Sequence, residues 1–456
     1  MPDSDDSVLE VDLLVLGAGM AGMSAAAYAA HHGASVLVME KGRQIGGSAV
    51  LSGGGFWTAT SYEVLREVNP QGEARQAHVL IDGYEEAAAW IRSLDVMMTA
   101  RMSTNYVQSF DSVGYSFDVA GYINACKAYV TSGGGWVVTS TQVSELVLEN
   151  GAVIGAIALD ESGAMTRVRS RWTLLATGGF QNSPGLRARY IGPHAAHFIV
   201  RSNPNSAGDG LSLGLAAGAA LSPHMDGWYG HTIPTPLNRP FEERDYLPLA
   251  QFFLSPRSVL LNRRGERFMD ESRGYYLNAQ AVAQLPEQRA LLVYDERTHQ
   301  EDTQMFGVDR SAVATAAGAH TARASTLAEL QEQVAAWRYD NVEATLAEYN
   351  AQVSTASHAL TPPRSKHARP LIAPLYAIEV QPAITFTHGG LRIDPQSRVL
   401  NARNEPIAGL LAAGADAGGT YHQAYAGGLA MACVFGLQAA RTVLHSIHGT
   451  NNQPGG

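Results

Sequence analysis

Cysteine is nearly absent from this chain of 456 residues, which contains only Cys126 and Cys433. Neither thiol stands at a metal-ligand spacing, so the sequence predicts no metal site and no disulfide framework, and we expect both thiols to be reduced and buried. Basic runs are also lacking, and the formal net charge is −10. That charge argues against a nucleic-acid backbone or an anionic membrane surface as a partner.

Long hydrophobic runs are missing as well. The most apolar stretches, such as residues 426–440, fall short of the ~18 to 20 residues that cross a membrane. Residues 1–7 are acidic where a secretory signal would be basic. We therefore expect a soluble, cytoplasmic protein without a membrane partner. With 46% hydrophobic residues, the chain can bury a large core and is long enough for two domains.

Glycine, in contrast, is abundant and gathered in short motifs. Residues 12–16 and 35–39 are apolar runs that predict buried parallel strands, and residues 19–32 predict a helix between them. At the first turn stand Gly17, Gly19 and Gly22, which suit a tight turn, a close approach to a pyrophosphate and a close helix–strand contact. Glu40 follows the second strand, where an acid accepts from ribose hydroxyls. This unit predicts a dinucleotide with its pyrophosphate at the positive end of the helix.

Three further glycine motifs extend the predicted site along the chain. They lie at residues 46–55, at residues 174–180 after another buried strand, and at residues 410–414 near the C-terminus. Together, in this order, the motifs predict one polypeptide that wraps a long dinucleotide along its whole length. The cofactor then supplies the chemistry, and the protein supplies orientation and electrostatics.

The composition changes within the chain. After about Met225 it becomes richer in Tyr, Phe, Arg and Pro, and this stretch ends near Thr361-Pro-Pro-Arg364 and Arg369-Pro370. We predict a first domain made of residues 1–225 and 370–456, interrupted by an inserted domain over residues 226–369. Within the insert, residues 325–351 predict one amphipathic helix.

The order of the glycine motifs, together with Ala207-Gly-Asp-Gly210 and Thr387-His-Gly-Gly-Leu391, resembles the fumarate reductase and succinate dehydrogenase flavoprotein superfamily. Its relatives include 3-ketosteroid dehydrogenases. The resemblance covers nearly the whole chain. It implies an α/β fold in which a Rossmann-like FAD-binding domain is interrupted by a smaller α+β capping domain. It also implies hydride exchange between flavin N5 and a carbon–carbon bond of a substrate held between cap and flavin.

The cofactor that the resemblance implies is FAD, bound noncovalently. Members with covalent flavin use a His near the second glycine motif, and here no His occurs between Gly33 and Gln76. The cofactor-binding residues that we predict are Gly17, Gly19, Met20, Ala21, Gly22, Glu40, Lys41, Gly47, Ser48, Ser52, Gly53, Gly54, Val143, Ala176, Thr177, Gly178, Asp209, Gly414, Asp416, Gly428 and Leu429.

The chain departs from the dicarboxylate-specific members of this superfamily. Those members bind two carboxylates through arginines, one of them four residues after an acidic pair like Asp270-Glu271. Here Tyr275 stands at that place, with Arg273 two residues out of register. Residues 404–440, where the second arginine is expected, contain no Lys or Arg. The usual bidentate partners of two carboxylates are therefore missing.

At both places 3-ketosteroid dehydrogenases carry tyrosines, and this chain resembles them with Tyr275 and with Tyr425-Ala-Gly427. Desaturation next to a ketone needs a donor on the carbonyl and a base for the α-proton. We assign the carbonyl donor to Tyr425 and the proton acceptor to Tyr275. Family members add a tyrosine from the N-terminal part, for which Tyr106 and Tyr115 are both candidates.

Other residues are candidates for binding substrate. Phe56 and Trp57 are predicted to wall the flavin pocket or to pack in the core, Arg273 is the first cation expected for a single carboxylate, and His388 and Gly427 lie in family glycine motifs. His224, Tyr229 and His231 follow Pro223 and are expected to line the site or lie at the surface.

These residues predict an FAD-dependent dehydrogenase that introduces a C=C bond α,β to a ketone of a cyclic or steroid-like substrate. The alternative is a reductase of an activated alkene such as fumarate, urocanate or a related acid. The electron acceptor is left open by the sequence.

Overall fold

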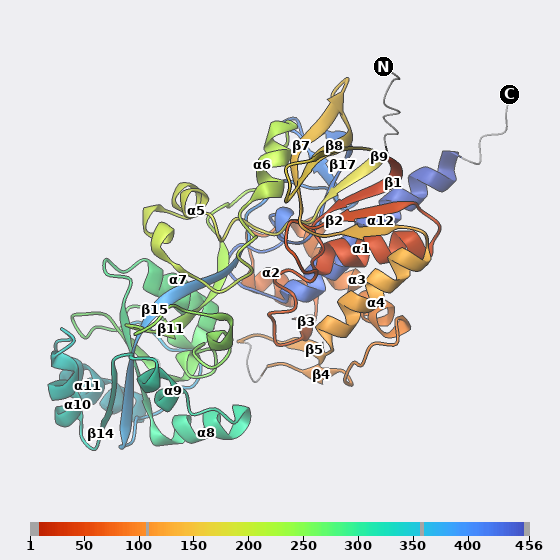
Figure 1. Cartoon of the computed structure of the whole chain (residues 1–456). Helices are drawn as coiled ribbons and strands as arrows, with labels where there is room; N and C mark the ends of the chain where they lie inside the picture. Colours follow the sequence, from red (N-terminus) through yellow and green to blue (C-terminus); the bar gives the residue numbers. More distant parts are fainter. Residues whose placement is uncertain (1–8, 106–108, 356–359, 451–456) are drawn as a thin grey trace.

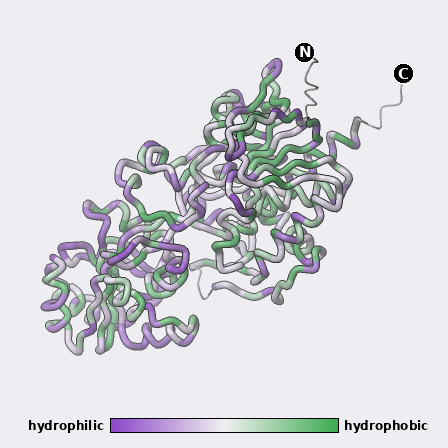
Figure 2. The backbone as a smooth tube through the Cα atoms, in the orientation of Figure 1, coloured by the Kyte–Doolittle hydropathy of each residue, from purple (hydrophilic) through white to green (hydrophobic). Residues whose placement is uncertain are grey.

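A computed structural model describes residues 9–105, 109–355 and 360–450 of the chain. Figure 1 shows two bodies, each with its own sheet, joined by several passages of the chain. The prediction of an α/β fold with a capping body is confirmed. Figure 2 shows the most hydrophobic backbone in the strands of the larger body, which is where continuous apolar runs are needed.

The larger body is built on an eight-stranded sheet with the order β16-β17-β9-β1-β2-β6, to which β8 and then β7 add beside β9. Strand β1 pairs in parallel with both β2 and β9, and β9 pairs in parallel with β17. The strands are β1 Leu9–Leu16, β2 Val36–Met39, β6 Trp136–Val138, β7 Thr141–Glu149, β8 Ala152–Asp160, β9 Met165–Leu175, β16 Arg398–Leu400 and β17 Pro406–Ala412.

Helix α1 (Met20–His31) lies directly after β1 and packs against the C-terminal helix α12 (Gly428–Thr450). Their approach is close, since a Cβ at Gly436 would lie 2.4 Å from the carbonyl oxygen of Ala21. Helix α12 is long and apolar enough to cross a membrane, but 61% of its most apolar window is buried inside the protein. Such burial is typical of a core helix.

The rest of the larger body consists of a second, smaller sheet, which begins where the second glycine motif ends, and of several helices. A three-stranded sheet consists of β3 (Gly55–Ala59), β5 (Ser112–Ser116) and β4 (Met102–Ser103). The remaining helices are α2 Tyr62–Val68, α3 Ala74–Ser93, α4 Val119–Ser132, α5 Pro184–Tyr190, α6 Asp209–Ala216, and the 3-10 turns η1 Pro193–His197 and η6 Gly414–Asp416.

The cap contains a six-stranded, mainly antiparallel sheet centred on the long strand β15 (Leu375–Thr387). The other strands are β10 Ile199–Val200, β11 Trp228–Pro234, β12 Val259–Leu261, β13 Ala290–Asp295 and β14 Thr321–Ala324. The helices are α7 Tyr275–Ala283, α8 Glu296–Phe306, α9 Arg310–Ala316, α10 Leu327–Ala335 and α11 Val342–Thr355, with 3-10 turns η2 Glu243–Asp245, η3 Ser255–Arg257 and η4 Glu271–Arg273.

Two features of the cap differ from the sequence-based expectation. The blue strand β15 in Figure 1 runs through the green cap, so the boundary predicted at residue 369 falls before the central strand of the cap sheet. The single helix expected over residues 325–351 is wrong. It is split into α10 and α11, with positive φ angles of 65° at Arg338 and 55° at Asn341 between them.

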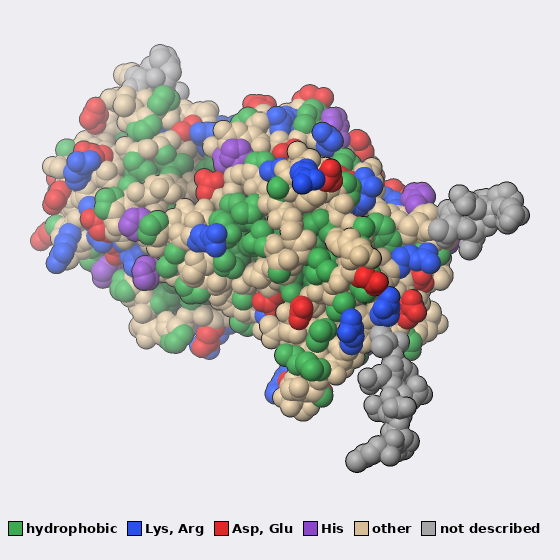
Figure 3. Space-filling model, turned by 90° about the horizontal axis from the view of Figure 1, so that it is seen from above, with side chains coloured by type: hydrophobic (Ala, Val, Ile, Leu, Met, Phe, Trp, Pro, Cys, Tyr) green, Lys and Arg blue, Asp and Glu red, His purple; other side chains and the backbone are tan. Residues whose placement is uncertain are grey.

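The surface carries charges of both signs. On the face seen in Figure 3, Lys and Arg lie interspersed with Asp and Glu rather than gathered in one field. This face therefore offers no basic stripe of the kind that follows a phosphate backbone.

Candidate active site

A cavity of about 450 Å³ lies where the cap meets the larger body. Its walls come from all the glycine motifs on one side and from cap aromatics on the other. The predicted cofactor residues that line it are Gly17, Gly19, Met20, Ala21, Glu40, Gly47, Ser48, Ser52, Gly53, Ala176, Thr177, Gly178, Gly414, Gly428 and Leu429. Segments almost 400 residues apart in the sequence thus form one continuous wall.

The first glycine turn has the shape that a pyrophosphate needs. At Gly17, where φ is +105°, a Cβ would lie 2.3 Å from the carbonyl oxygen of Ala176. At Gly22 a Cβ would lie 2.0 Å from the carbonyl oxygen of Gly17, so helix and strand touch there. Gly19 is the N-cap of α1, and a Cβ at this position would meet only Gly46 O, at 4.0 Å. The turn therefore leaves room for a phosphate at the positive end of α1.

The far end of the cofactor site lies in a small neighbouring cavity of about 40 Å³. Glu40 lines both cavities, and its carboxylate accepts from the amides of Ala18 and Gly42 at 2.9 and 2.7 Å. The predicted residues Lys41, Val143 and Asp209 line only this small cavity, where Lys41 Nζ lies 2.6 Å from Asp209 Oδ2. The carboxylate of Glu40 stands where a dinucleotide's ribose hydroxyls need an acceptor.

Three predicted cofactor residues lie behind the walls instead of lining them. Gly22 supports the turn described above. Gly54 packs under Phe117, since a Cβ there would lie 2.6 Å from its carbonyl oxygen. Asp416 is buried, and its carboxylate accepts from the amide and hydroxyl of Thr177. These residues shape the cofactor wall without facing the cavity.

Tyr275 and Tyr425 both line the cavity, although they come from the cap helix α7 and from the loop before α12. Tyr229 of β11 joins them. Its ring stacks on Tyr425 with centroids 3.7 Å apart, and its hydroxyl lies 3.1 Å from that of Tyr275. The same hydroxyl lies 3.0 Å from Nε2 of His231, which also lines the cavity. A chain of three hydrogen-bonding groups therefore begins at Tyr275.

Burial sets the protonation of these groups. It raises the pKa of Tyr275 well above its usual value, with the nearby phenols of Tyr229 and Tyr425 acting in the same direction. It also raises the pKa of Tyr425, whereas the Gly428 amide, Arg201 and Trp57 favour the phenolate. Burial lowers the pKa of His231 well below its usual value, and the charges of Arg201 and Arg310 add to this. Near neutral pH the phenols are protonated and the imidazole is neutral.

Of the two N-terminal candidates, Tyr115 lies in the part of the chain that the structure describes, and it is not part of this cluster. Tyr115 is buried, and its hydroxyl donates to Glu85 Oε2 at 2.7 Å instead of reaching the cavity. Tyr106 lies outside the described residues. The third tyrosine that the structure places at the cluster is Tyr229, from the cap. Its sequence signal is the two-residue period of a strand, which places Tyr229 and His231 on one face.

Of the predicted substrate residues, only Trp57 lines the cavity. Phe56 is fully buried behind it and stacks on Tyr84. Gly427 packs on the backbone of Trp57, and His388 is buried with Nδ1 3.2 Å from the carbonyl oxygen of His422. Burial lowers the pKa of His388 to about 4.

The cation expected at the site is in a different place. The side chain of Arg273 is exposed at the end of η4 and does not line the cavity, because η4 ends before the chain turns inward at Tyr275. Arg201, which follows β10, lines it instead. Sequence reasoning missed Arg201 because a lone arginine after the short apolar run 198–200 carries no motif.

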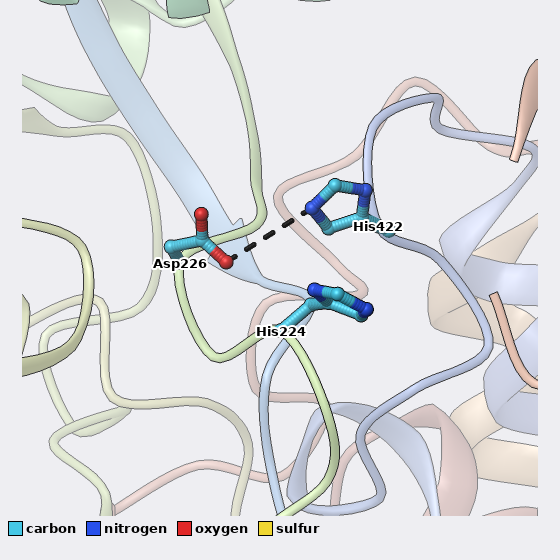
Figure 4. Close-up of side chains that lie close together, drawn as sticks. All are labelled: His224, Asp226 and His422. Carbon is cyan, nitrogen blue, oxygen red and sulfur yellow. Dashed lines mark ion pairs between the residues drawn. The ribbon is translucent and has the colours of Figure 1, made fainter. Parts of the chain in front are cut away.

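A cluster outside the cavity brings together His224, Asp226 and His422 (Figure 4). One potential ligand atom from each residue lies within 4.8 Å of the other two, and His422 Nε2 is 4.0 Å from Asp226 Oδ1. His224 and Asp226 are exposed, and none of the three lines the cavity. The sequence predicts no metal here, since the residues are separated by almost 200 positions. We therefore assign this cluster no role in the chemistry of the cavity.

The comparisons with known proteins agree with this geometry. A family profile described as an FAD binding domain matches residues 12–92 and 120–429. The chain is 26% identical over 470 residues to an NADH:fumarate oxidoreductase of Klebsiella pneumoniae (strain 342), covering 98% of this chain and 49% of that protein. It thus spans about half the length of that relative.

Two further relatives match along nearly their whole length. A vinyl phenol reductase of Lactiplantibacillus plantarum is 25% identical over 476 residues, covering 93% of each chain. A 3-oxosteroid 1-dehydrogenase of Mycobacterium tuberculosis is 26% identical over 541 residues, covering 90% of this chain and 93% of that protein. FAD as the cofactor and an oxidoreductase activity are confirmed, whereas the branch of the superfamily is left undecided.

The fold also matches that of a solved structure. The 3-ketosteroid-Δ4-(5α)-dehydrogenase of Rhodococcus jostii RHA1, in complex with 4-androstene-3,17-dione, superposes with a TM-score of 0.77 at 22% identity. The match covers 97% of this chain and 99% of that one. It shows that both bodies of the chain have the arrangement of that fold.

Proposed function

We propose that this chain, which belongs to the FAD binding domain family, is a dehydrogenase that introduces a C=C bond α,β to a ketone of a cyclic or steroid-like substrate. The observation that carries the proposal is the cluster of Tyr229, Tyr275 and Tyr425 on the cavity wall. Neutral hydroxyl donors suit a ketone, whereas two carboxylates need a pair of cations.

Tyr425 is the donor to the substrate carbonyl in this proposal. Its raised pKa keeps the hydroxyl protonated, so it can donate to an oxygen that gains negative charge as the enolate develops. The Gly428 amide and the Trp57 side chain hydrogen-bond to Tyr425 itself and favour its phenolate, which makes the hydroxyl a stronger donor. The start of α12 adds its positive end, since Gly428 is the first residue of the helix.

Tyr275 takes the α-proton, and its neighbours make that possible. A buried, protonated phenol can accept a proton only if its own proton leaves at the same time. Tyr229 lies 3.1 Å away to receive that proton, and His231 Nε2 lies 3.0 Å further on. His231 is neutral and has a lone pair free on Nε2 when Nδ1 carries its proton. The three residues thus form a proton relay that leads away from the substrate.

The chain holds FAD noncovalently in this proposal, because residues 34–75 offer no His for a covalent link. The glycine turn and the start of α1 hold the pyrophosphate, and Glu40 holds the ribose. FAD, when bound, supplies a two-electron acceptor for the hydride that leaves the β-carbon. Trp57 and Phe252 add apolar side chains to the cavity wall.

Reduction of an activated alkene is the second candidate. It is favoured by two relatives named as reductases, the NADH:fumarate oxidoreductase and the vinyl phenol reductase. In that direction the same relay would deliver a proton through Tyr275. The tyrosine cluster is compatible with both dehydrogenation and reduction, so an experiment must distinguish the two functions.

The test is anaerobic spectroscopy of the purified yellow protein. A panel of cyclic ketones, steroid ketones among them, is added to the oxidised protein, and bleaching of the flavin is expected with at least one of them. Chemically reduced protein is then mixed with fumarate, urocanate and a vinyl phenol. Reoxidation by one of these alkenes without bleaching by any ketone would reverse the assignment in favour of the reductase.

A further inference from the structure

Arg201 is a buried arginine of the cavity wall. Its side chain is held by two hydrogen bonds, since Nε donates to the carbonyl oxygen of Tyr246 at 2.7 Å and Nη1 to Oγ1 of Thr385 at 3.2 Å. The residue is 8% exposed, and its backbone amide donates to Ile384 O at 2.8 Å in the cap sheet. The guanidinium therefore has a fixed place and direction, set by β10 and β15.

The Cζ of this guanidinium lies 5.4 Å from the ring centroid of Tyr246, but several of its N–H groups have no hydrogen-bond acceptor among the described residues. A guanidinium has five N–H donors, and the bonds above use two of them. Among residues 9–105, 109–355 and 360–448, no carboxylate lies within 4.0 Å of Arg201, and the other N–H groups have no acceptor. A buried guanidinium without a counter-charge costs free energy unless another group supplies the missing acceptors and negative charge.

The other buried arginines of the chain show that this state is unusual here. Arg310 is paired with Asp302 at 3.1 Å, and Arg267 is paired with Glu271 at 2.7 Å. Arg187 has no carboxylate, but its Nε, Nη1 and Nη2 all donate to backbone carbonyls. Among the residues that the structure describes, Arg201 is the buried arginine that both lines the main cavity and keeps N–H groups without an acceptor.

The surroundings of Arg201 place it at the substrate end of the cavity. It interacts electrostatically with the phenols of Tyr229, Tyr275 and Tyr425, which are protonated and offer no counter-charge. The phosphate-binding turn at Gly17 and Gly19 belongs to the other body, on the large sheet. The missing anion is therefore expected from the molecule that faces the phenols, not from the pyrophosphate.

We propose that Arg201 binds a carboxylate of the substrate, so that the substrate class is a cyclic ketone carrying one acidic group. The proposal rests on the proposed function for its ketone part. It also limits the number of acidic groups, because Arg201 is the one Lys or Arg among the described residues that line the cavity. One guanidinium can pair with one carboxylate, and no second cation is left for another carboxylate.

The experiment uses the FAD-loaded protein and matched ligand pairs. Each pair is a cyclic keto acid and its methyl ester, and binding is followed by perturbation of the flavin absorbance. The wild type is expected to bind the acid more tightly than the ester. Arg201→Gln is expected to weaken binding of the acid roughly 10- to 100-fold, the value of charge-assisted hydrogen bonds, and to leave the ester unchanged. Arg201→Lys, which keeps the charge but not the fork, is expected to fall between them.

Arg273→Gln is the matched control, since Arg273 is the exposed arginine outside the cavity. It should keep the preference for the acid. Equal binding of acid and ester by the wild type, no binding of any acid at millimolar concentration, or loss of FAD from Arg201→Gln would each overturn the inference. The last result would assign the guanidinium to the cofactor.

Failure of the inference and failure of the proposed function give different results. Ketones that bleach the flavin without any preference for the acid would leave the dehydrogenase in place and remove the role of Arg201. Carboxylates that bind through Arg201 while no ketone bleaches the flavin would support the anion site and contradict the dehydrogenase.

Discussion

The hydroxyl of Tyr229 lies 3.1 Å from the hydroxyl of Tyr275, although the two residues belong to a strand and a helix of the cap. Their side chains are buried, and Tyr229 also contacts Nε2 of His231. This pair links the residue that faces the substrate to a neutral imidazole. The direction of the hydrogen bonds decides whether Tyr275 works as an acid or a base, and both directions are available because each hydroxyl can donate and accept.

Replacing Tyr275 by Phe removes the hydroxyl that we propose to exchange the α-proton. We expect the turnover to fall by roughly 10²- to 10⁴-fold, the usual contribution of a general acid or base, while the flavin spectrum stays unchanged. Tyr276→Phe is the control, since Tyr276 is the buried neighbour outside the cavity. The measurement is steady-state turnover with an artificial electron acceptor. Turnover of Tyr275→Phe equal to that of Tyr276→Phe would remove Tyr275 from the chemistry.

Replacing Tyr229 by Phe tests the relay while the first phenol stays in place. The ring can still stack on Tyr425, but Tyr275 loses its proton acceptor. We expect a smaller fall in turnover than for Tyr275→Phe, of at least about 10-fold. The double variant should be no slower than Tyr275→Phe alone, because both changes interrupt one path. Additive losses would show that Tyr229 acts separately from Tyr275.

Replacing Tyr425 by Phe removes the hydroxyl that we propose as the donor to the substrate carbonyl. Loss of one such donor costs about 10²- to 10³-fold in turnover, and we expect a value in this range. A phenol that mimics the enolate should also bind more weakly to the variant, as followed by the long-wavelength absorbance of the flavin. Unchanged binding of the phenol would place the carbonyl elsewhere in the cavity.

Replacing Gly17 by Ala tests the cofactor turn. The added Cβ would lie 2.3 Å from Ala176 O, and the backbone there cannot shift without moving the end of β9. We expect a protein purified without FAD. Gly33→Ala is the matched control, since φ is +89° there but no atom lies within 4 Å of the added Cβ. It should retain FAD and lose only roughly 1–2 kcal/mol from the left-handed backbone. A yellow Gly17→Ala protein would contradict the close packing of this turn.

The parts of the site that could be predicted are those made by short segments. Gly17, Gly19 and Glu40 follow from one strand–helix–strand unit, because its geometry is local. Tyr275 and Tyr425 followed from a resemblance in short motifs, and the cavity brings both of them together. Their roles in catalysis are still predictions.

The parts that escaped prediction depend on long-range pairing. Arg201 reaches the cavity because β10 pairs with β15, whose residues come almost 200 positions later. Tyr229 was expected to line the site or lie at the surface, but its contact with Tyr275 was not foreseen, since it depends on the pairing of β11 with the same strand, with an irregularity in the register next to Gly230. No local pattern specifies such pairings. The split of the helix expected over residues 325–351 has a different cause, since amphipathic periodicity continues across residues 336–341 while the backbone does not.

The buried carboxylate of Asp416, behind the cofactor wall, predicts how the stability of the protein depends on pH. Its carboxylate accepts from the amide and hydroxyl of Thr177, and burial raises its pKa to about 7 from the ordinary value of 3.8. Between these two values the folded protein binds more protons at this position than the unfolded chain does. The contribution of Asp416 to stability is therefore present at low pH and is lost as the pH rises towards about 7.

Asp416→Asn keeps an oxygen acceptor for Thr177 but cannot ionise, so this variant should not lose stability in this way as the pH rises. We expect the melting temperature of the wild type to fall relative to Asp416→Asn as the pH is raised from about 4 to about 7, and then to run parallel to it. Asp160→Asn is the control, because the hydrogen bond from Ser162 lowers the pKa of Asp160 and moves its titration below this window. A constant difference between wild type and Asp416→Asn over the whole range would mean that Asp416 is already ionised at low pH. The hydrogen bonds from Thr177 would then outweigh the burial of the carboxylate.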